Sequence, residues 1–167
     1  IVDDEALLSL AALNRLVRVD LGSEALTESI EGPLPIATSI VDHRSPNFEG
    51  QHDPHLLPDG SIQILDNLGE PSATRVLRIG ADRTITSVWA LVDDDRGTWT
   101  SPEPLKCPMK GSAIPLDNGT VLVGCKDAGV MVLDRPNGTT SDGPAWFLDL
   151  ACGDVEIGGV FRALPGP

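Results

Sequence analysis

The sequence predicts an all-β fold, a β-propeller whose blades each consist of four antiparallel strands. Three observations predict it: short β-rich runs recur along the 167 residues, tight-turn signals separate them, and the runs repeat every ~55 residues. Glycine (17 residues) and proline (14 residues) are in excess, as expected for many turns between short strands. Because 41% of the residues are hydrophobic, the excess favours turns in a folded chain over disorder.

The clearest repeat is a hairpin that occurs twice. Residues 57–66 read LPDGSIQILD, and residues 115–124 read PLDNGTVLVG. In each, the end of one strand leads into an Asp-Gly or Asn-Gly turn and then into a β-rich run, which is typical of a hairpin. Each hairpin therefore supplies the first two strands of one blade.

Two further strands follow in each unit. The third strand begins at Arg15, Arg75 and Gly129, so that its starts are 60 and then 54 residues apart. A fourth strand follows each of these after a polar turn. The expected strands are 6–11, 15–20 and 25–30 in the first unit, 53–57, 61–66, 74–79 and 84–91 in the second, and 112–116, 120–124, 129–134 and 145–150 in the third.

We expect a single propeller segment over residues 1–167, with approximate blades at 1–50, 51–100 and 101–152. The first blade lacks its first strand, and 153–167 carries a lone terminal strand at residues 160–164. Three blades cannot close a ring, and an open end leaves unpaired strand edges. The expected partner is therefore the remainder of a propeller, as another chain or a second copy.

Two alternatives stay open from the residues alone. Residues 3–18 begin with two acidic residues and contain many good helix formers, which suits a helix. The pattern LVRVD at residues 16–20 alternates with period two, which favours a strand. For the whole chain, the alternative fold is an immunoglobulin-like sandwich that uses a cysteine pair.

Residues 32–50 form the longest irregular stretch, which is expected to cross the surface or line a site.

Charge and composition exclude some classes of function. The chain has 12 basic and 25 acidic residues, a formal net charge of −13, so a nucleic-acid phosphate backbone would be repelled. No stretch approaches the roughly 18–20 apolar residues that a membrane span needs. The sequence holds no CxxC motif or Cys/His cluster, and no metal or other cofactor is expected.

The chain has three cysteines, Cys107, Cys125 and Cys152, too few for a disulfide-dense scaffold. Cys107 and Cys125 flank a predicted strand, turn and strand, so a disulfide across adjacent strands is geometrically reasonable. Three small buried side chains in a reducing compartment are the alternative. Asn118 and Asn137 each begin an Asn-Gly-Thr triplet, which fits a glycosylation site but is first of all a tight-turn signal.

The three histidines of the chain, His43, His52 and His55, lie within a stretch of 13 residues. Since an imidazole titrates near neutral pH, this cluster is a candidate for acid-base chemistry; the alternative is a strand with polar residues at its entrance. His52 and His55 are three residues apart in an extended chain. We therefore expect them on opposite faces, which argues against a metal site.

Polar groups at the end of the next strand complete the candidate site. Asp66 and Asn67 end the strand that returns antiparallel to the His52 strand, and Arg75 begins the one after it. A histidine, an amide and a guanidinium at one strand end suit a sulfate, a phosphate or a carboxylate. The expected ligand is a small oxyanion.

Residues 51–67, QHDPHLLPDGSIQILDN, and residues 73–79, ATRVLRI, resemble the hallmark segment of the arylsulfotransferase (arylsulfate sulfotransferase) family. The resemblance implies a six-bladed propeller that moves a sulfuryl group from a phenolic sulfate ester to another phenol through a sulfated histidine, without a nucleotide-type donor. It also implies catalytic roles for His52 and Arg75, the latter by binding sulfate. His55, Asn67 and His43 are then the candidates for substrate binding.

The family pattern also implies a sulfated histidine well downstream, whereas no histidine follows His55 here. The sequence therefore supports two hypotheses: an enzyme of sulfuryl transfer, and a non-catalytic secreted propeller that serves binding or assembly. A periplasmic or extracellular location is expected from the family's secreted habit and from a chain that begins at Ile1 instead of Met.

Overall fold

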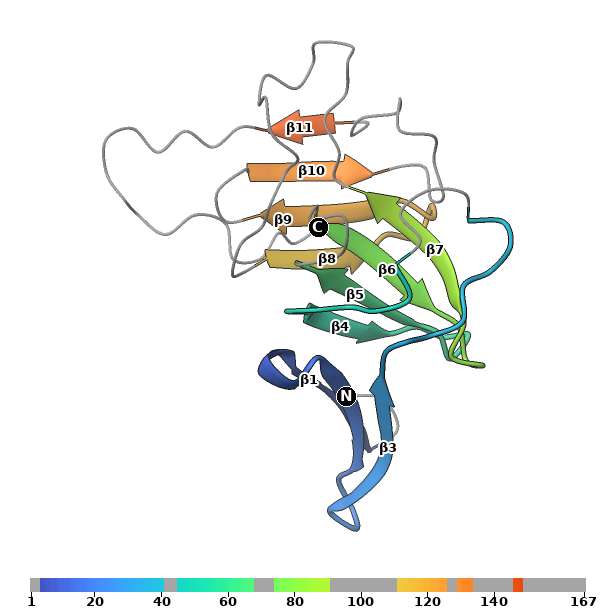
Figure 1. Ribbon diagram of the computed structural model, residues 1–167. Helices are drawn as coiled ribbons and strands as arrows, with labels where there is room; N and C mark the ends of the chain where they lie inside the picture. The colour runs from blue at the N-terminus through green and yellow to red at the C-terminus, as the bar shows by residue number, and fades with distance from the viewer. Residues whose placement is uncertain are drawn as a thin grey trace.

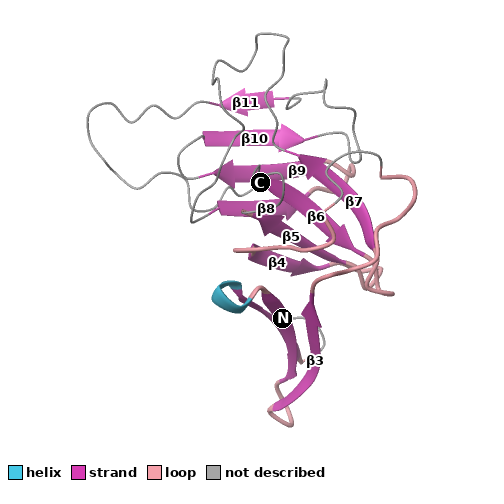
Figure 2. Ribbon diagram, in the orientation of Figure 1, coloured by secondary structure: helices cyan, strands magenta, loops and turns pink. Residues whose placement is uncertain are grey.

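The computed structural model describes residues 4–40, 45–67, 74–90, 111–125, 129–133 and 146–148. This part of the chain is all-β, as predicted, and its only helical element is the short 3-10 helix Ala11–Leu13 (Figure 2). Its strands form three antiparallel sheets in which consecutive strands are neighbours.

We call the three sheets sheet 1, sheet 2 and sheet 3 in chain order (Figure 1). Sheet 1 has three strands, and sheets 2 and 3 have four each. Sheet 1 contains β1 (Glu5–Leu10), β2 (Arg15–Asp20) and β3 (Ala25–Glu31). Sheet 2 contains β4 (His52–Leu56), β5 (Ile62–Asp66), β6 (Arg75–Ile79) and β7 (Ile85–Ala90). Sheet 3 contains β8 (Gly111–Pro115), β9 (Val121–Cys125), β10 (Gly129–Leu133) and β11 (Trp146–Leu148).

Each strand predicted between residues 6 and 150 is present, with ends that differ from the expected ones by about one or two residues. The helix considered for residues 3–18 is wrong, because β1 and β2 occupy that range. The immunoglobulin-like alternative is also wrong, since a sandwich has two sheets and the described residues form three. The predicted lone strand at 160–164 lies outside the described residues.

The three turns at 57–61, 80–84 and 116–120 share one hydrogen-bond pattern. In each turn, the backbone N–H of the first residue donates a hydrogen bond to the carbonyl of the last residue, and the fourth residue has a positive φ. An Asp or Asn at the third position accepts hydrogen bonds from the Ser or Thr two residues later. The positive-φ residue is glycine in both predicted hairpins, whereas Arg83 takes this conformation in the turn 80–84.

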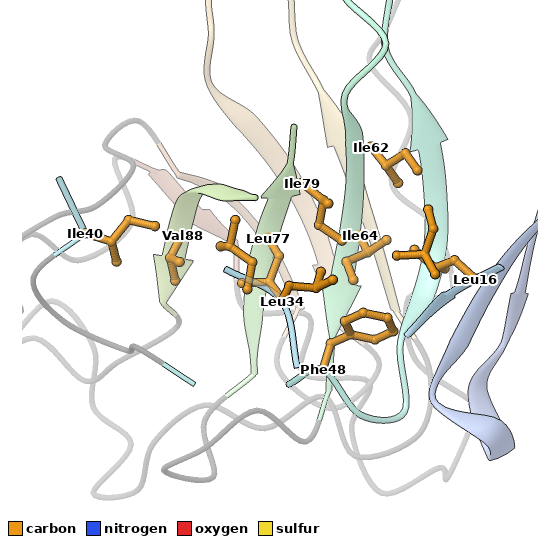
Figure 3. Close-up of a cluster of buried hydrophobic side chains, with 11 residues drawn as sticks. Leu16, Leu34, Ile40, Phe48, Ile62, Ile64, Leu77, Ile79 and Val88 are labelled. Carbon is orange, nitrogen blue, oxygen red and sulfur yellow. The ribbon is translucent and has the colours of Figure 1, made fainter. Parts of the chain in front are cut away.

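Sheet 2 lies between sheets 1 and 3, and each of its faces is buried (Figure 1). One face packs against sheet 1, and the side chains of this cluster are drawn in Figure 3. The opposite face packs against sheet 3 and carries Leu65, Val76 and Trp89. In the described part of the chain the three sheets form a stack that does not close into a ring.

The connection between β3 and β4 is part of the core. Leu34, Ile40 and Phe48 of this segment are buried in the cluster between sheets 1 and 2 (Figure 3). The backbone of Ile85 in β7 accepts a hydrogen bond from Ala37 at 2.9 Å and donates one to Pro35 at 2.8 Å. The described part of this segment thus crosses the surface, as expected, and its apolar side chains also cover sheet 2.

Candidate functional site

A β-bulge in β4 determines where the histidines lie. His52 pairs with Leu65 of β5, and His55 pairs with Gln63, so two residues of β4 stand opposite one residue of β5. The bulge residue Asp53 has a φ of 50°, in the left-handed region that Asp tolerates better than most residues. Since Leu65 and Gln63 lie on one face of β5, both histidines lie on that face too. Our expectation of opposite faces is wrong, because it assumed a regular strand.

The same bulge joins His55 to a carboxylate and to sheet 3. His55 Nε2 lies 2.9 Å from Asp53 Oδ2, and that oxygen also accepts a hydrogen bond from the backbone N–H of Ala113 in β8 at 3.1 Å. The side chains of His55 and Asp53 are 23% and 20% exposed, respectively. A half-buried imidazole oriented by a carboxylate is an arrangement that can accept or deliver a proton.

A second polar group joins sheets 2 and 3 beside this pair. Gln63 Nε2 donates to the backbone carbonyl of Ala113 at 3.0 Å, and Gln63 Oε1 accepts from Arg78 Nη2 at 3.2 Å. The guanidinium of Arg78 lies 5.4 Å from the ring centre of Trp89, within the range of a cation–π interaction. Asp53 and Gln63 thus hold both backbone polar groups of Ala113, which fixes the first strand of sheet 3 beside the histidines.

Arg75 lies on the other face of sheet 2. It pairs with Asp66 and is two residues from Leu77, which packs toward sheet 1. Its Nε donates to Asp66 Oδ2 at 2.8 Å, and its Nη2 donates to the backbone carbonyls of Ser45 and Asn47 at 3.2 and 2.5 Å. A sulfate could reach this buried guanidinium only if these contacts opened.

The carboxylate of Asp66 completes this arrangement. Its Oδ1 accepts the backbone N–H of Glu49 at 2.9 Å, and its side chain is fully buried. Asp66 and Arg75 therefore hold the chain at residues 45–49 across the end of sheet 2, just before β4.

Asn67 follows β5 at the end of the sheet where His52 lies. The Asn67 side chain is buried, and within the described part of the chain neither of its amide atoms has a hydrogen-bond partner. Buried Gln51 donates from Nε2 to the carbonyl of Arg15 at 2.9 Å, while its Oε1 has no partner in the same part of the chain. Buried amide groups without a protein partner are suited to bind water or a polar ligand atom.

The structure thus brings His52 and His55 onto one face, with Asn67 at the adjacent strand end, and places Arg75 on the opposite face. His43 lies outside the described residues. The sequence interpretation missed Asp53 and Gln63, which orient this site. An Asp-Pro-His triplet inside a strand was the available signal, because Asp accommodates the left-handed conformation of a bulge.

Cys125 ends β9 and is fully buried. Cys107 and Cys152 lie outside the described residues, so the Cys107–Cys125 disulfide stays a prediction. The described ranges contain no group of three or more residues that could hold a metal ion. They also contain no helix that is long and apolar enough to cross a membrane.

Comparisons with protein-family models, with curated proteins and with solved structures found no match for this chain. The resemblance to arylsulfotransferases therefore rests on residues 51–67 and 73–79 of this chain.

Proposed function

We propose that this chain is part of an arylsulfotransferase-like β-propeller that transfers a sulfuryl group from an aryl sulfate ester to a phenolic acceptor. The observation that carries the proposal is the bulge at Asp53, which gathers His52 and His55 on one face of β4. The order and antiparallel pairing of the strands within each sheet agree with propeller blades. A periplasmic or extracellular location belongs to the same proposal.

In the proposed reaction His52 exchanges protons with the phenols. The bond between sulfur and the donor phenol oxygen breaks, and a bond between sulfur and the acceptor phenol oxygen forms. The acceptor's proton passes to the imidazole of His52, which delivers it to the departing phenolate. His55, oriented by Asp53, binds the sulfate oxygens. The amide of Asn67 is buried, so it joins His55 only if the chain around it opens.

Arg75 has a different role in this proposal from the one that the resemblance implies. Its guanidinium is bound to Asp66 and to the carbonyls at 45 and 47, so it supports the chain that leads into β4. The side chain that faces the sulfate in place of Arg75 is then His55.

The test is an assay of transfer from a chromogenic aryl sulfate to a phenol, with His52→Gln, His55→Gln and the control Leu13→Gln. Leu13 is exposed and lies in the 3-10 helix, outside the proposed site. We expect the His52 variant to lose at least ~100-fold in rate, the His55 variant to lose less, and the control to keep the wild-type rate. Wild-type protein with no transfer rules out the enzyme, and a His52 variant at full rate rules out the role proposed for His52.

The second candidate function is non-catalytic binding or assembly by the same propeller. Its supporting observation is that Asp53 and Gln63 use the polar groups near the histidines to join sheets 2 and 3. This hypothesis predicts a wild-type protein without sulfuryl transfer, in which Asp53→Asn lowers stability because Ala113 loses a charged acceptor.

A further inference from the structure

Sheet 1 has one face buried against sheet 2 and a second face that carries several exposed apolar side chains. Leu16 and Ile30 point toward sheet 2 and are buried in the shared cluster. The opposite face, which we call the outer face of sheet 1, carries residues that alternate with these along the strands. Its apolar members are Ala6, Leu8, Leu10, Val17, Val19 and Leu26. Leu8, Leu10 and Leu26 are exposed, whereas Val17 in the central strand β2 is only 6% exposed.

The exposure of large apolar side chains is concentrated in this region. Within the described residues five large hydrophobic side chains are exposed, and three of them, Leu8, Leu10 and Leu26, lie on the outer face of sheet 1. The other two, Leu13 and Leu21, lie in the 3-10 helix and in the turn after β2. Leu8 is 45% exposed and Leu26 is 63% exposed, although both are strand residues. Apolar side chains gathered on one sheet face indicate a surface that another element covers.

The internal repeat shows what kind of element covers this face. In sheet 2 the equivalent face is buried under sheet 1 and the β3–β4 connection. The two sheets match in detail, because β2–β3 has a register shift between Arg18 and Val19, and β6–β7 has one between Arg78 and Ile79. The outer face of sheet 1 is thus the face on which the observed stack would continue with another antiparallel sheet.

The side of sheet 3 away from sheet 2 is also apolar, and Leu122 at its centre is 9% exposed. Ile114, Leu122 and Val132 pair across β8, β9 and β10 and alternate with the residues that pack against sheet 2. Val130 lies on the same side in β10. We call this surface the outer face of sheet 3. This face of sheet 3 is equivalent to the face of sheet 2 that contains Leu65. In sheet 2, that face packs against the next sheet in the chain, sheet 3.

We propose that two copies of this chain associate head to tail, with the outer face of sheet 1 in each copy packed on the outer face of sheet 3 in the other. Such a pair has two identical interfaces related by a twofold axis, and it would join the three sheets described in each copy into one closed ring. Each interface repeats the sheet-on-sheet packing already present within one copy. The proposal does not depend on sulfuryl transfer.

Charge gives the association a specific salt dependence. Each copy carries a formal net charge of −13, so two copies repel each other over long range. Added salt screens this repulsion and leaves apolar burial almost unchanged. We expect tighter association at ~0.5 M salt than at ~0.05 M salt, the opposite of an interface held by ion pairs.

The test is sedimentation of the full chain over a concentration range of about 1 to 100 µM, with three proteins compared. The double variant Leu8→Gln/Leu26→Gln makes the outer face polar at exposed positions. Leu13→Gln is a matched control, because Leu13 and Leu26 are both 63% exposed and Leu13 lies in the 3-10 helix. We expect a wild-type dimer, association weaker by at least ~10-fold in the double variant, and no change in the control.

Mixing two damaged copies tests the head-to-tail arrangement. Copies with Leu8→Gln/Leu26→Gln and copies with Ile114→Gln have one intact interface when they pair with each other and none when they pair with themselves. Energy transfer between labelled copies should therefore show mixed pairs in excess. Mixed pairs at or below the level of like pairs, a wild-type monomer with native strand content throughout the range, growth beyond two copies, or equal loss in the control overturns the proposal.

Discussion

Arg15 and Arg75 begin equivalent strands of sheets 1 and 2, and each faces an acidic residue on a neighbouring strand. The Arg15–Glu31 pair, at 2.6 Å, has side chains that are 40% and 58% exposed. The Arg75–Asp66 pair, at 2.8 Å, has side chains that are 2% and 0% exposed. The difference arises because residues 45–49 cover Arg75, whereas Arg15 is at the edge of the outer face of sheet 1. Equivalent positions in a repeat can therefore differ greatly in energetic weight.

The largest effect that we predict tests this difference directly. Arg75→Ala leaves the carboxylate of Asp66 buried without its cation and removes a donor from two carbonyls, so it should cost about 3–5 kcal/mol in the free energy of unfolding. Arg15→Ala removes an exposed pair and should cost about 0–1 kcal/mol. Urea unfolding of both variants gives the comparison, and equal losses would contradict the assignment of the buried pair.

A double variant separates lost pairing from lost packing at the same position. Asp66→Leu/Arg75→Met replaces both charges with apolar side chains and should recover part of the stability lost in Arg75→Ala, because no unpaired charge stays buried. If the double variant is less stable than the single one, the hydrogen bond that Asp66 accepts from Glu49 contributes more than is gained by removing the unpaired charge.

Substitutions on the two faces of sheet 1 should differ in their effect on the free energy of unfolding. Leu16 is fully buried toward sheet 2, so Leu16→Ala should cost about 2–5 kcal/mol through lost burial and a residual cavity. Leu8 is on the outer face, and Leu8→Ala should cost less than about 1 kcal/mol when the protein is measured at a dilution that keeps it monomeric. Thermal unfolding at several concentrations checks this, and a large loss for Leu8 in the monomer would show that its face is already covered.

The smallest predicted effect is a difference in the pH dependence of stability between equivalent turns of sheets 2 and 3. Hydrogen bonds from the side chain and backbone of Ser61 lower the pKa of Asp59 below its ordinary value of 3.8. Asn118 takes the same position in the turn 116–120 and does not titrate. The lowered pKa means that Asp59 stabilises the fold above pH 3.8 and that this contribution is lost as the pH falls through the folded-state pKa.

Two reciprocal substitutions check this pH dependence. Asp59→Asn should keep the turn and make stability below pH 3.8 less sensitive to pH, while Asn118→Asp should make it more sensitive. Each change is expected to be small, a few tenths of a kcal/mol, because the groups are at the surface. Acid unfolding curves of the two variants and the wild type measure this pH dependence. Parallel curves for both variants and wild type would exclude a role for these hydrogen bonds.

Much of the fold was predictable from local patterns. The hairpins at 57–66 and 115–124 follow from turn chemistry that depends on only a few neighbouring residues. The bulge at Asp53 was not predicted, because an extra residue in a strand leaves little trace in a pattern of alternation. The same error placed His52 and His55 on opposite faces.

The sequence by itself determined the strands, their antiparallel order and the turns between them, since these depend on side-chain alternation and local backbone preference. Only the tertiary structure decided which face of each strand is covered. Arg75 illustrates this, because a guanidinium that looked available for an anion is buried by a segment some 30 residues away in the chain. Burial depends on contacts between distant segments, and no local pattern encodes them. For the same reason, the exposed leucines of sheet 1 became a candidate interface only when the three sheets were seen together.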